Sequence, residues 1–70
     1  MSRSPVASSN VASIGYDEPT ETLEVEFTNG SVYQYFNVGS AIHEQLMQSP
    51  SIGQFLNLYI KNAYPFTRVG

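Results

Sequence analysis

The pair Asn29-Gly30, flanked by alternating apolar residues, constrains the fold more than any other feature of the sequence. Asn and Gly tolerate positive φ angles and are favoured in the two-residue type I′ turn of a β-hairpin. Leu23, Val25 and Phe27 alternate with polar residues before the turn, as in a strand with one buried face. The sequence therefore predicts a hairpin over residues 23–36.

A two-residue turn also determines which residues of the two strands lie opposite each other. With Asn29-Gly30 as the loop, Leu23 is opposite Phe36 and Glu24 is opposite Tyr35. One face then carries the apolar side chains and is expected to pack on helices. The other face carries two acids, which could hold a divalent cation. Acids that face tyrosines across a strand pair are more typical of a hydrated sheet face, and a partner can cover the exposed tyrosines. The residues of this expected interface are Glu24, Glu26, Tyr33 and Tyr35.

Residues 11–16 predict a third strand, because apolar side chains recur there at every second position. After Phe36 the apolar spacing changes to that of helices, which we expect at 41–47 and 52–60. Ser49-Pro50 separates the two helices, since proline cannot continue the first one. Each helix has one apolar face that must be buried against another element.

The expected fold belongs to the α+β class. A three-stranded antiparallel β-meander is followed by two short α-helices packed on one face and by an extended C-terminal tail at 64–69. Residues 1–9 are mostly small and polar and are expected to form a flexible arm. Residues 10–70 are then a single domain, because 70 residues are too few for two.

The charge of the chain limits its partners. Lys and Arg number 3 and Asp and Glu number 6, so the formal net charge is -3. Binding a long nucleic acid through its phosphates takes roughly 6 to 10 basic contacts, which argues against that class of partner. No apolar segment approaches the about 20 residues of a membrane span, and no signal-peptide pattern begins the chain. We expect a cytoplasmic protein without a membrane partner.

The inventory of reactive side chains argues against an enzyme. The chain has no Cys and a single histidine, His43, which has no metal ligand one helical turn away and is expected to be solvated. No serine is placed with a histidine and an acid that would activate it. We therefore expect no metal, no cofactor and no catalysis.

The C-terminal segment concentrates groups that bind planar anions. Lys61 and Arg68 lie close in sequence to Tyr64 and Phe66. Arg and Lys bind phosphate oxygens, and aromatic rings stack on bases. Together with Tyr33, these residues predict a site for a compact nucleotide-like ligand. In the alternative, the rings close the core and Lys61 caps the carbonyls that end the second helix.

Four segments of the sequence stand in a fixed order: 9–17, 23–35, Ser51-x-Gly53-x-Phe55 and Ile60-Lys61-x-x-Tyr64-Pro65-Phe66. In this arrangement the chain resembles the KTSC domain family, which is named for its occurrence at the C-terminus of some lysyl-tRNA synthetases. Members are often free-standing proteins of bacteria and phages. The resemblance implies an α+β fold and says little about chemistry. Gly39 departs from the proline of many members, which affects only the start of the first helix.

The leading hypothesis is a non-catalytic binding protein that oligomerises. It would hold a compact anion, such as a cyclic nucleotide signal, at the boundary between two copies, in the manner of a phage sequestering protein. Symmetry would then supply Lys61 and Arg68 a second time. Two alternatives stay open: an accessory module for RNA or tRNA handling, and a module that binds a host protein through the face with the acids and tyrosines.

Overall fold

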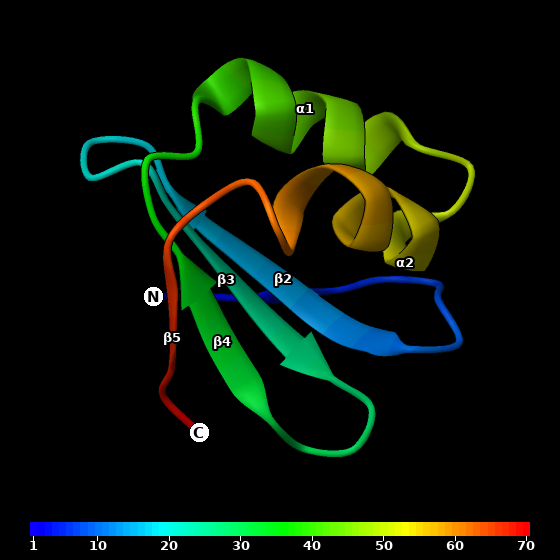
Figure 1. The fold of residues 1–70 in the computed structure, drawn as a ribbon. Coiled ribbons are helices and arrows are strands. Elements are labelled where there is room, and N and C mark those ends of the chain that lie inside the picture. Colours follow the sequence, from blue (N-terminus) through cyan, green and yellow to red (C-terminus); the bar gives the residue numbers. More distant parts are fainter.

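The computed structural model describes residues 1–70 and has the expected α+β architecture, with an antiparallel sheet of five strands in the order β1-β2-β3-β4-β5 (Figure 1). Two helices follow the fourth strand, and the second continues directly into a π-helical segment, η1. The strands are β1 Ser4–Pro5, β2 Val11–Asp17, β3 Thr22–Phe27, β4 Val32–Tyr35 and β5 Phe66–Arg68. The helical segments are α1 Ser40–Gln48, α2 Ile52–Phe55 and η1 Leu56–Ile60.

The prediction of three strands is incomplete, because both edge strands were expected to be irregular. β1 comes from the expected N-terminal arm and pairs with β2, with Ser4 opposite Ile14. β5 comes from the expected C-terminal tail and pairs with β4, with Phe66 opposite Tyr35. Segments of two and three residues are too short to show the alternation by which strands are found in a sequence.

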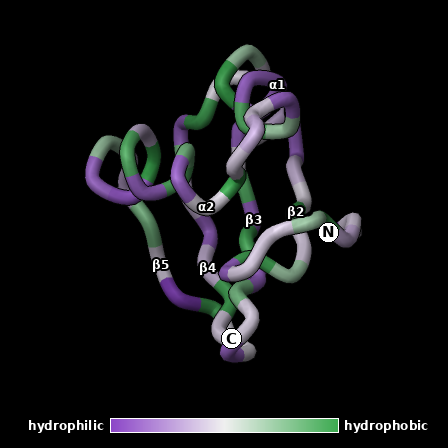
Figure 2. Tube along the Cα trace, turned by 90° about the vertical axis from the view of Figure 1, so that its right-hand side faces the viewer, coloured by the Kyte–Doolittle hydropathy of each residue, from purple (hydrophilic) through white to green (hydrophobic).

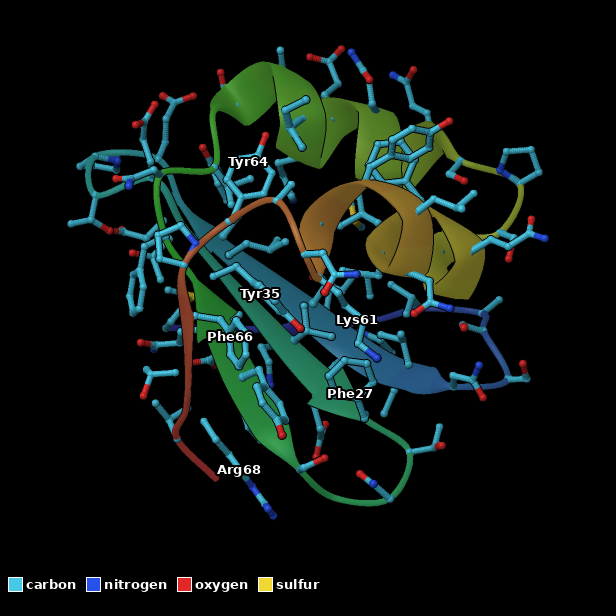
Figure 3. The ribbon with its side chains drawn as sticks, in the orientation of Figure 1. Phe27, Tyr35, Lys61, Tyr64, Phe66 and Arg68 are labelled. Atoms are coloured by element: carbon cyan, nitrogen blue, oxygen red, sulfur yellow. The ribbon has the colours of Figure 1, made fainter.

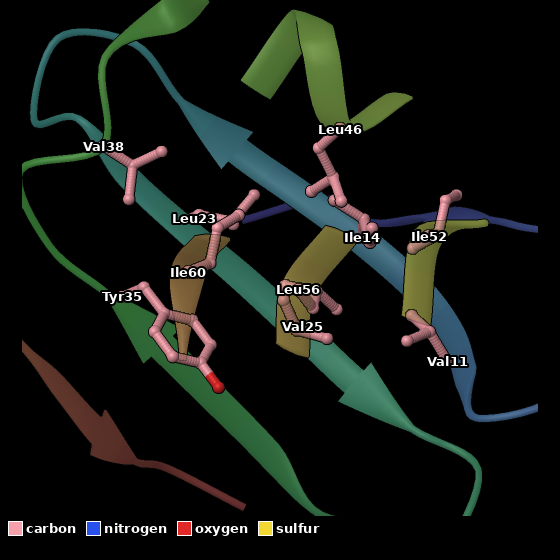
Figure 4. Packing of buried hydrophobic residues seen from close by; sticks show 10 residues of the cluster. All are labelled: Val11, Ile14, Leu23, Val25, Tyr35, Val38, Leu46, Ile52, Leu56 and Ile60. Atoms are coloured by element: carbon pink, nitrogen blue, oxygen red, sulfur yellow. The ribbon is translucent and has the colours of Figure 1, made fainter. Parts of the chain in front are cut away.

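Both helices contribute to one core on a single face of the sheet. Side chains of β2, β3 and β4 meet side chains of α1, α2 and η1 there (Figure 4). Stretches of hydrophobic and of hydrophilic residues follow one another along the chain trace (Figure 2). Val25 and Leu46 are fully buried, as the predicted apolar stripes require. The core consists of Val11, Ile14, Leu23, Val25, Tyr35, Val38, Leu46, Ile52, Leu56 and Ile60.

The turn of the hairpin differs from the predicted one. The N–H of Gly30 donates to the carbonyl of Phe27 at 2.9 Å, and the N–H of Phe27 donates to the carbonyl of Ser31 at 2.9 Å. Gly30 has a positive φ of 92°, whereas Asn29 has none. This is a three-residue loop, in which a type I turn is followed by one left-handed residue.

The longer loop shifts the register of the hairpin by one residue and moves the tyrosines to the other face. Tyr35 lies opposite Leu23, and Tyr33 lies opposite Val25. Residues opposite each other in an antiparallel pair point to the same side of the sheet. The prediction that Tyr35 belongs to a partner-covered outer face is therefore wrong. Tyr35 is part of the core, with 2% of its surface exposed.

The other face of the sheet carries the acids, and the N-terminal segment crosses it (Figure 1). Nη1 of Arg3 lies 2.6 Å from Oε2 of Glu24, and Nε2 of Gln34 donates to Oε1 of Glu24 at 2.9 Å. The hydroxyl of Ser13 donates to Oε1 of Glu26 at 2.8 Å. Glu24 is 8% exposed, so the prediction of a hydrated interface is wrong for this residue. Side chains of the same chain, such as Arg3 and Ser13, contact the two acids instead.

Candidate functional site

A groove of about 810 Å³ opens on the helix side of the sheet, between the β3–β4 hairpin, η1 and the start of β5 (Figure 3). Four aromatic rings line it: Phe27, Tyr33, Tyr35 and Phe66. The shifted hairpin register puts both tyrosines on this side, and the β4–β5 pairing places Phe66 beside Tyr35. The groove thus depends on the two features of the sheet that the sequence did not predict.

The four rings form a continuous aromatic floor. The centroid of Tyr33 lies 5.8 Å from that of Phe27, with the rings nearly perpendicular at 83°. Phe66 lies 5.9 Å from Tyr33 and 5.8 Å from Tyr35. These distances are typical of packed aromatic pairs. Phe66 is 55% exposed, so this part of the floor is open to a ligand.

Lys61 extends over this floor from the end of η1. Its Nζ lies 5.6 Å from the centroid of the Phe27 ring, a cation–π contact (Figure 3). The backbone N–H of Lys61 donates to the carbonyl of Leu56, five residues back, at 2.9 Å, which is the wider spacing of a π-helix. In the structure Nζ lies over the Phe27 ring, whereas the capping alternative requires it at the carbonyls that end the helix.

Apart from Val11, Gly53 and Leu56, the rest of the lining is polar and uncharged. Asparagines from four separate segments contribute to it, and Asp and Glu are absent from it. Both salt bridges of the structure involve Arg3 on the opposite face, so Lys61 and Arg68 have no acidic partner. The groove therefore combines a free cation, amide groups and aromatic surface. The asparagines are Asn10, Asn29, Asn57 and Asn62.

The structure brings together some of the predicted site residues and separates others. Lys61, Tyr33 and Phe66 line the groove. Tyr64 is half-buried against the core and lies above the turn into β5, away from Phe27 and Lys61 (Figure 3). Arg68, on β5, lies opposite Tyr33 of β4 and beyond the groove. Its Nε donates to the carbonyl of Gly70 at 2.7 Å.

Sequence reasoning missed Phe27 and the asparagines as lining residues. Phe27 was expected in the core, but it is only half-buried at the end of β3 and borders the groove. The asparagines come from a loop before β2, the hairpin turn, η1 and the segment after it. No local pattern links four such segments, because only the tertiary fold brings them together.

His43 lies outside the groove and is not the solvated residue that was expected. Its ring stacks on Tyr16, with centroids 4.3 Å apart and an angle of 7°. The hydroxyl of Tyr16 donates to the carbonyl of Val38 at 2.5 Å. Burial lowers the pKa of His43, while the nearby Glu44 raises it to a smaller extent. His43 is thus a packing residue between α1 and β2.

No three His, Cys, Asp or Glu side chains lie close enough together to hold a metal ion. No helix has both the length and the apolar character needed to cross a bilayer.

The chain is similar to proteins of one family of small domains. The family model of the KTSC domain matches residues 7–64. The chain belongs to the KTSC domain family. The crystal structure of a KTSC domain protein from Yersinia pestis superposes with a TM-score of 0.92 at 37% sequence identity, covering 99% of this chain and 97% of that one. The resemblance noted in the sequence is therefore confirmed.

Relatives of this KTSC domain include larger and similarly small proteins. A lysine–tRNA ligase of Nostoc punctiforme is 39% identical over 59 residues, which cover 84% of this chain but 10% of the ligase. A protein of Stutzerimonas stutzeri is 36% identical over 87% of this chain and 86% of its own length. The KTSC domain thus spans only a small part of the ligases that it matches, because the matched segment is 10% of the Nostoc punctiforme ligase.

Proposed function

We propose that this KTSC domain is a non-catalytic binding protein that sequesters a compact anion with a planar group, such as a cyclic nucleotide signal, in the groove beside Lys61. The observation that carries the proposal is the position of Lys61 Nζ, 5.6 Å above the Phe27 ring and without an acidic partner. We place the protein in the cytoplasm as part of the same proposal.

Each part of the groove suits one part of such a ligand. A base stacked on the exposed Phe66 ring would gain about 1–3 kcal/mol, whatever its identity. The amides of Asn57 and Asn62 can both donate to and accept from the edge of a base. Lys61 offers an ammonium group to phosphate oxygens at the same opening.

The size and the lining of the groove support a small ligand and binding without reaction. Ligand pockets usually measure about 300–1,000 Å³, and this groove of about 810 Å³ lies in that range. One lysine can neutralise the charge of one phosphate but not the backbone of a long nucleic acid. The hydroxyl groups of the lining, such as that of Ser31, have no His, Asp or Glu in the lining to activate them as nucleophiles.

Isothermal titration tests the proposal. The probes are cyclic di- and trinucleotides, ADP-ribose, AMP and inorganic phosphate, titrated into the whole chain. We expect one of the nucleotides to bind, with affinity reduced at least tenfold by Lys61→Gln and by Phe66→Ala. If none of the probes gives binding heat, the proposal is overturned.

Matched variants separate the groove from general effects of charge or aromatic content. Gln45→Glu, on the exposed side of α1, changes the net charge by the same amount as Lys61→Gln. Tyr59→Ala removes an exposed ring outside the groove, as a match for Phe66→Ala. Both controls should bind like the unchanged protein. If Gln45→Glu weakens binding as much as Lys61→Gln does, the ligand responds to overall charge and not to the groove.

The match to a lysine–tRNA ligase favours one second candidate, an accessory role in RNA binding. In that case unpaired bases would stack in the same groove. An electrophoretic shift with tRNA and with single-stranded RNA distinguishes this candidate, because phosphate contacts weaken steeply as salt rises. A third candidate, docking of a host protein on the acid face, loses its expected tyrosines to the other side of the sheet.

A further inference from the structure

The last strand, β5, is an open edge of the sheet, and its three residues are all exposed. The carbonyl of Pro65 accepts from the N–H of Phe36 at 2.8 Å, and the N–H of Val69 donates to the carbonyl of Val32 at 2.8 Å. Alternate residues of a strand direct their backbone groups to opposite sides. The N–H and C=O groups of Phe66 and Arg68 therefore point away from β4, to the open edge.

We infer that a second copy of this chain pairs with this edge, antiparallel and with a two-fold axis at Thr67. In that arrangement Phe66 of each copy lies opposite Arg68 of the other. These are the two residues whose backbone groups are free, so each opposite pair exchanges both of its hydrogen bonds in the pattern of an antiparallel ladder. The edge is thus complementary to itself in its backbone hydrogen bonding.

The side chains of the edge are complementary as well. Phe66 lies opposite Tyr35 and Arg68 lies opposite Tyr33, so both point to the groove side of the sheet. Pairing around Thr67 would place the guanidinium of each copy beside the Phe66 ring of the other, where cation–π attraction is favourable. Only Nε of Arg68 is engaged within its own chain, with the carbonyl of Gly70 at 2.7 Å. This match of cation to ring favours a second copy over an unrelated peptide strand.

The pairing also changes the groove, and this consequence rests on the function proposed above. Phe66 lines the groove, whereas Arg68 of the same chain lies beyond it. A second copy would bring its own Arg68 to the Phe66 ring, and so to the border of the groove. Each groove would then have two cations, Lys61 from one copy and Arg68 from the other, for a ligand with more than one phosphate.

A single-cysteine variant tests the position of the axis, because the chain has no cysteine of its own. At the axis the two Thr67 residues form a non-hydrogen-bonded pair with Cα atoms about 4.5 Å apart, which is within the range that a disulfide spans. We expect Thr67→Cys to form a disulfide-linked dimer at least ten times faster than Gln45→Cys, at a position on α1 that is also exposed. Equal rates for the two variants would overturn the inference.

Sedimentation velocity without any ligand gives a second readout. A three-residue ladder buries less than the about 1,200–2,000 Å² of a stable interface, so the average mass should rise with concentration instead of being fixed. Arg68→Pro removes the edge-facing N–H and the guanidinium together, and we expect it to remain monomeric. An unchanged protein that stays monomeric at millimolar concentration would also overturn the inference.

The two proposals fail in different ways. Association without heat from any nucleotide would leave the dimer standing and remove the proposed ligand. Heat from a nucleotide, with a monomeric protein and no preference of Thr67→Cys for cross-linking, would remove the dimer and leave the single-chain groove.

Discussion

Arg3 and Glu24 form a close ion pair across the face of the sheet that the helices leave uncovered, with 2.6 Å between Nη1 and Oε2. The pair ties the N-terminal segment to β3. Glu24 also accepts a hydrogen bond from Gln34, and this bond, followed by the contact with Arg3, holds the pKa of its carboxyl below the ordinary value. The first residues of the chain are therefore part of the folded structure and of its response to acid.

Loss of the arginine should destabilise the protein in a way that depends on pH. Arg3→Met leaves the Glu24 carboxylate buried with one partner fewer, which should lower the free energy of unfolding by about 1–3 kcal/mol at pH 7. Folding lowers the pKa of Glu24. The stability that its ionised carboxylate contributes is therefore present above the ordinary pKa of 4.5 and is lost as pH falls through the folded-state pKa. Urea unfolding at pH 7 and pH 3 should show a smaller difference between variant and parent at pH 3.

The matched control for that measurement is Arg68→Met, studied at low micromolar protein. Arg68 is exposed and has no carboxylate partner, so its replacement should change the free energy of unfolding by no more than about 0.5 kcal/mol. If the two arginine variants unfold at the same urea concentration, the ion pair does not stabilise the fold.

Gly15 is the position where the N-terminal segment comes closest to the sheet. A Cβ there would lie 2.6 Å from the carbonyl oxygen of Ser2, closer than real Cβ contacts allow. Gly15→Ala should therefore displace residues 1–3 and remove most of the stabilisation from Arg3. Its effect on unfolding should be far from additive with that of Arg3→Met in a double-mutant cycle.

Gly53 provides the comparison for this substitution. A Cβ at Gly53 meets its nearest atom, in the side chain of Asn10, at 3.6 Å, which is an ordinary contact. Gly53→Ala should not destabilise the protein, since alanine is the better helix former by about 1 kcal/mol. Equal losses of stability at both glycines would contradict the close approach at Gly15.

The stacked pair of His43 and Tyr16 should make stability depend on pH near neutrality. Burial holds the pKa of His43 below its ordinary value of 6.5. As pH falls below 6.5 the unfolded chain takes up a proton that the folded chain does not, so the folded state loses stability until the folded-state pKa is reached. Thermal unfolding should show this loss between pH 7 and pH 5 in the parent and not in His43→Gln. The same pH dependence in both proteins would rule out His43 as its source.

Two leucines with opposite exposure test the position of the core. Leu23 is 0% exposed within the core cluster, and Leu58 on η1 is 71% exposed. Leu23→Ala should lower the free energy of unfolding by about 2–5 kcal/mol, whereas Leu58→Ala should change it by less than about 0.5 kcal/mol. Chemical denaturation of the two variants measures both values. Comparable losses would mean that the helices do not cover the sheet as described.

The elements with several periods of a regular pattern could be predicted from the sequence, and the register between them could not. Both helices and the three long strands lie near their expected positions. Both Asn29 and Gly30 accept positive φ, but only Gly30 adopts it. That difference of one residue in the loop exchanges the faces of Tyr33 and Tyr35, because side chains alternate along a strand.

The candidate site was predictable to the extent that its residues lie close together in sequence. Lys61 and Phe66 were selected from one short segment, and both line the groove. Arg68 was selected in the same way, but it lies two residues farther along β5, on the same side of the sheet and past the groove. The four asparagines and Phe27 could be found only after the pairing of β3, β4 and β5 was known.

The sheet order has a consequence for how the molecule folds. β2, β3 and β4 follow one another in the chain, so their pairing closes only short loops. β5 pairs with β4 although both helices lie between them in the sequence. Longer loops are closed later, because their entropy must be offset by contacts already made. We expect β5 to dock last, so a refolding chain should bury its core before it completes the aromatic groove. Stopped-flow refolding should then show Phe66→Ala to speed unfolding while leaving the folding rate nearly unchanged.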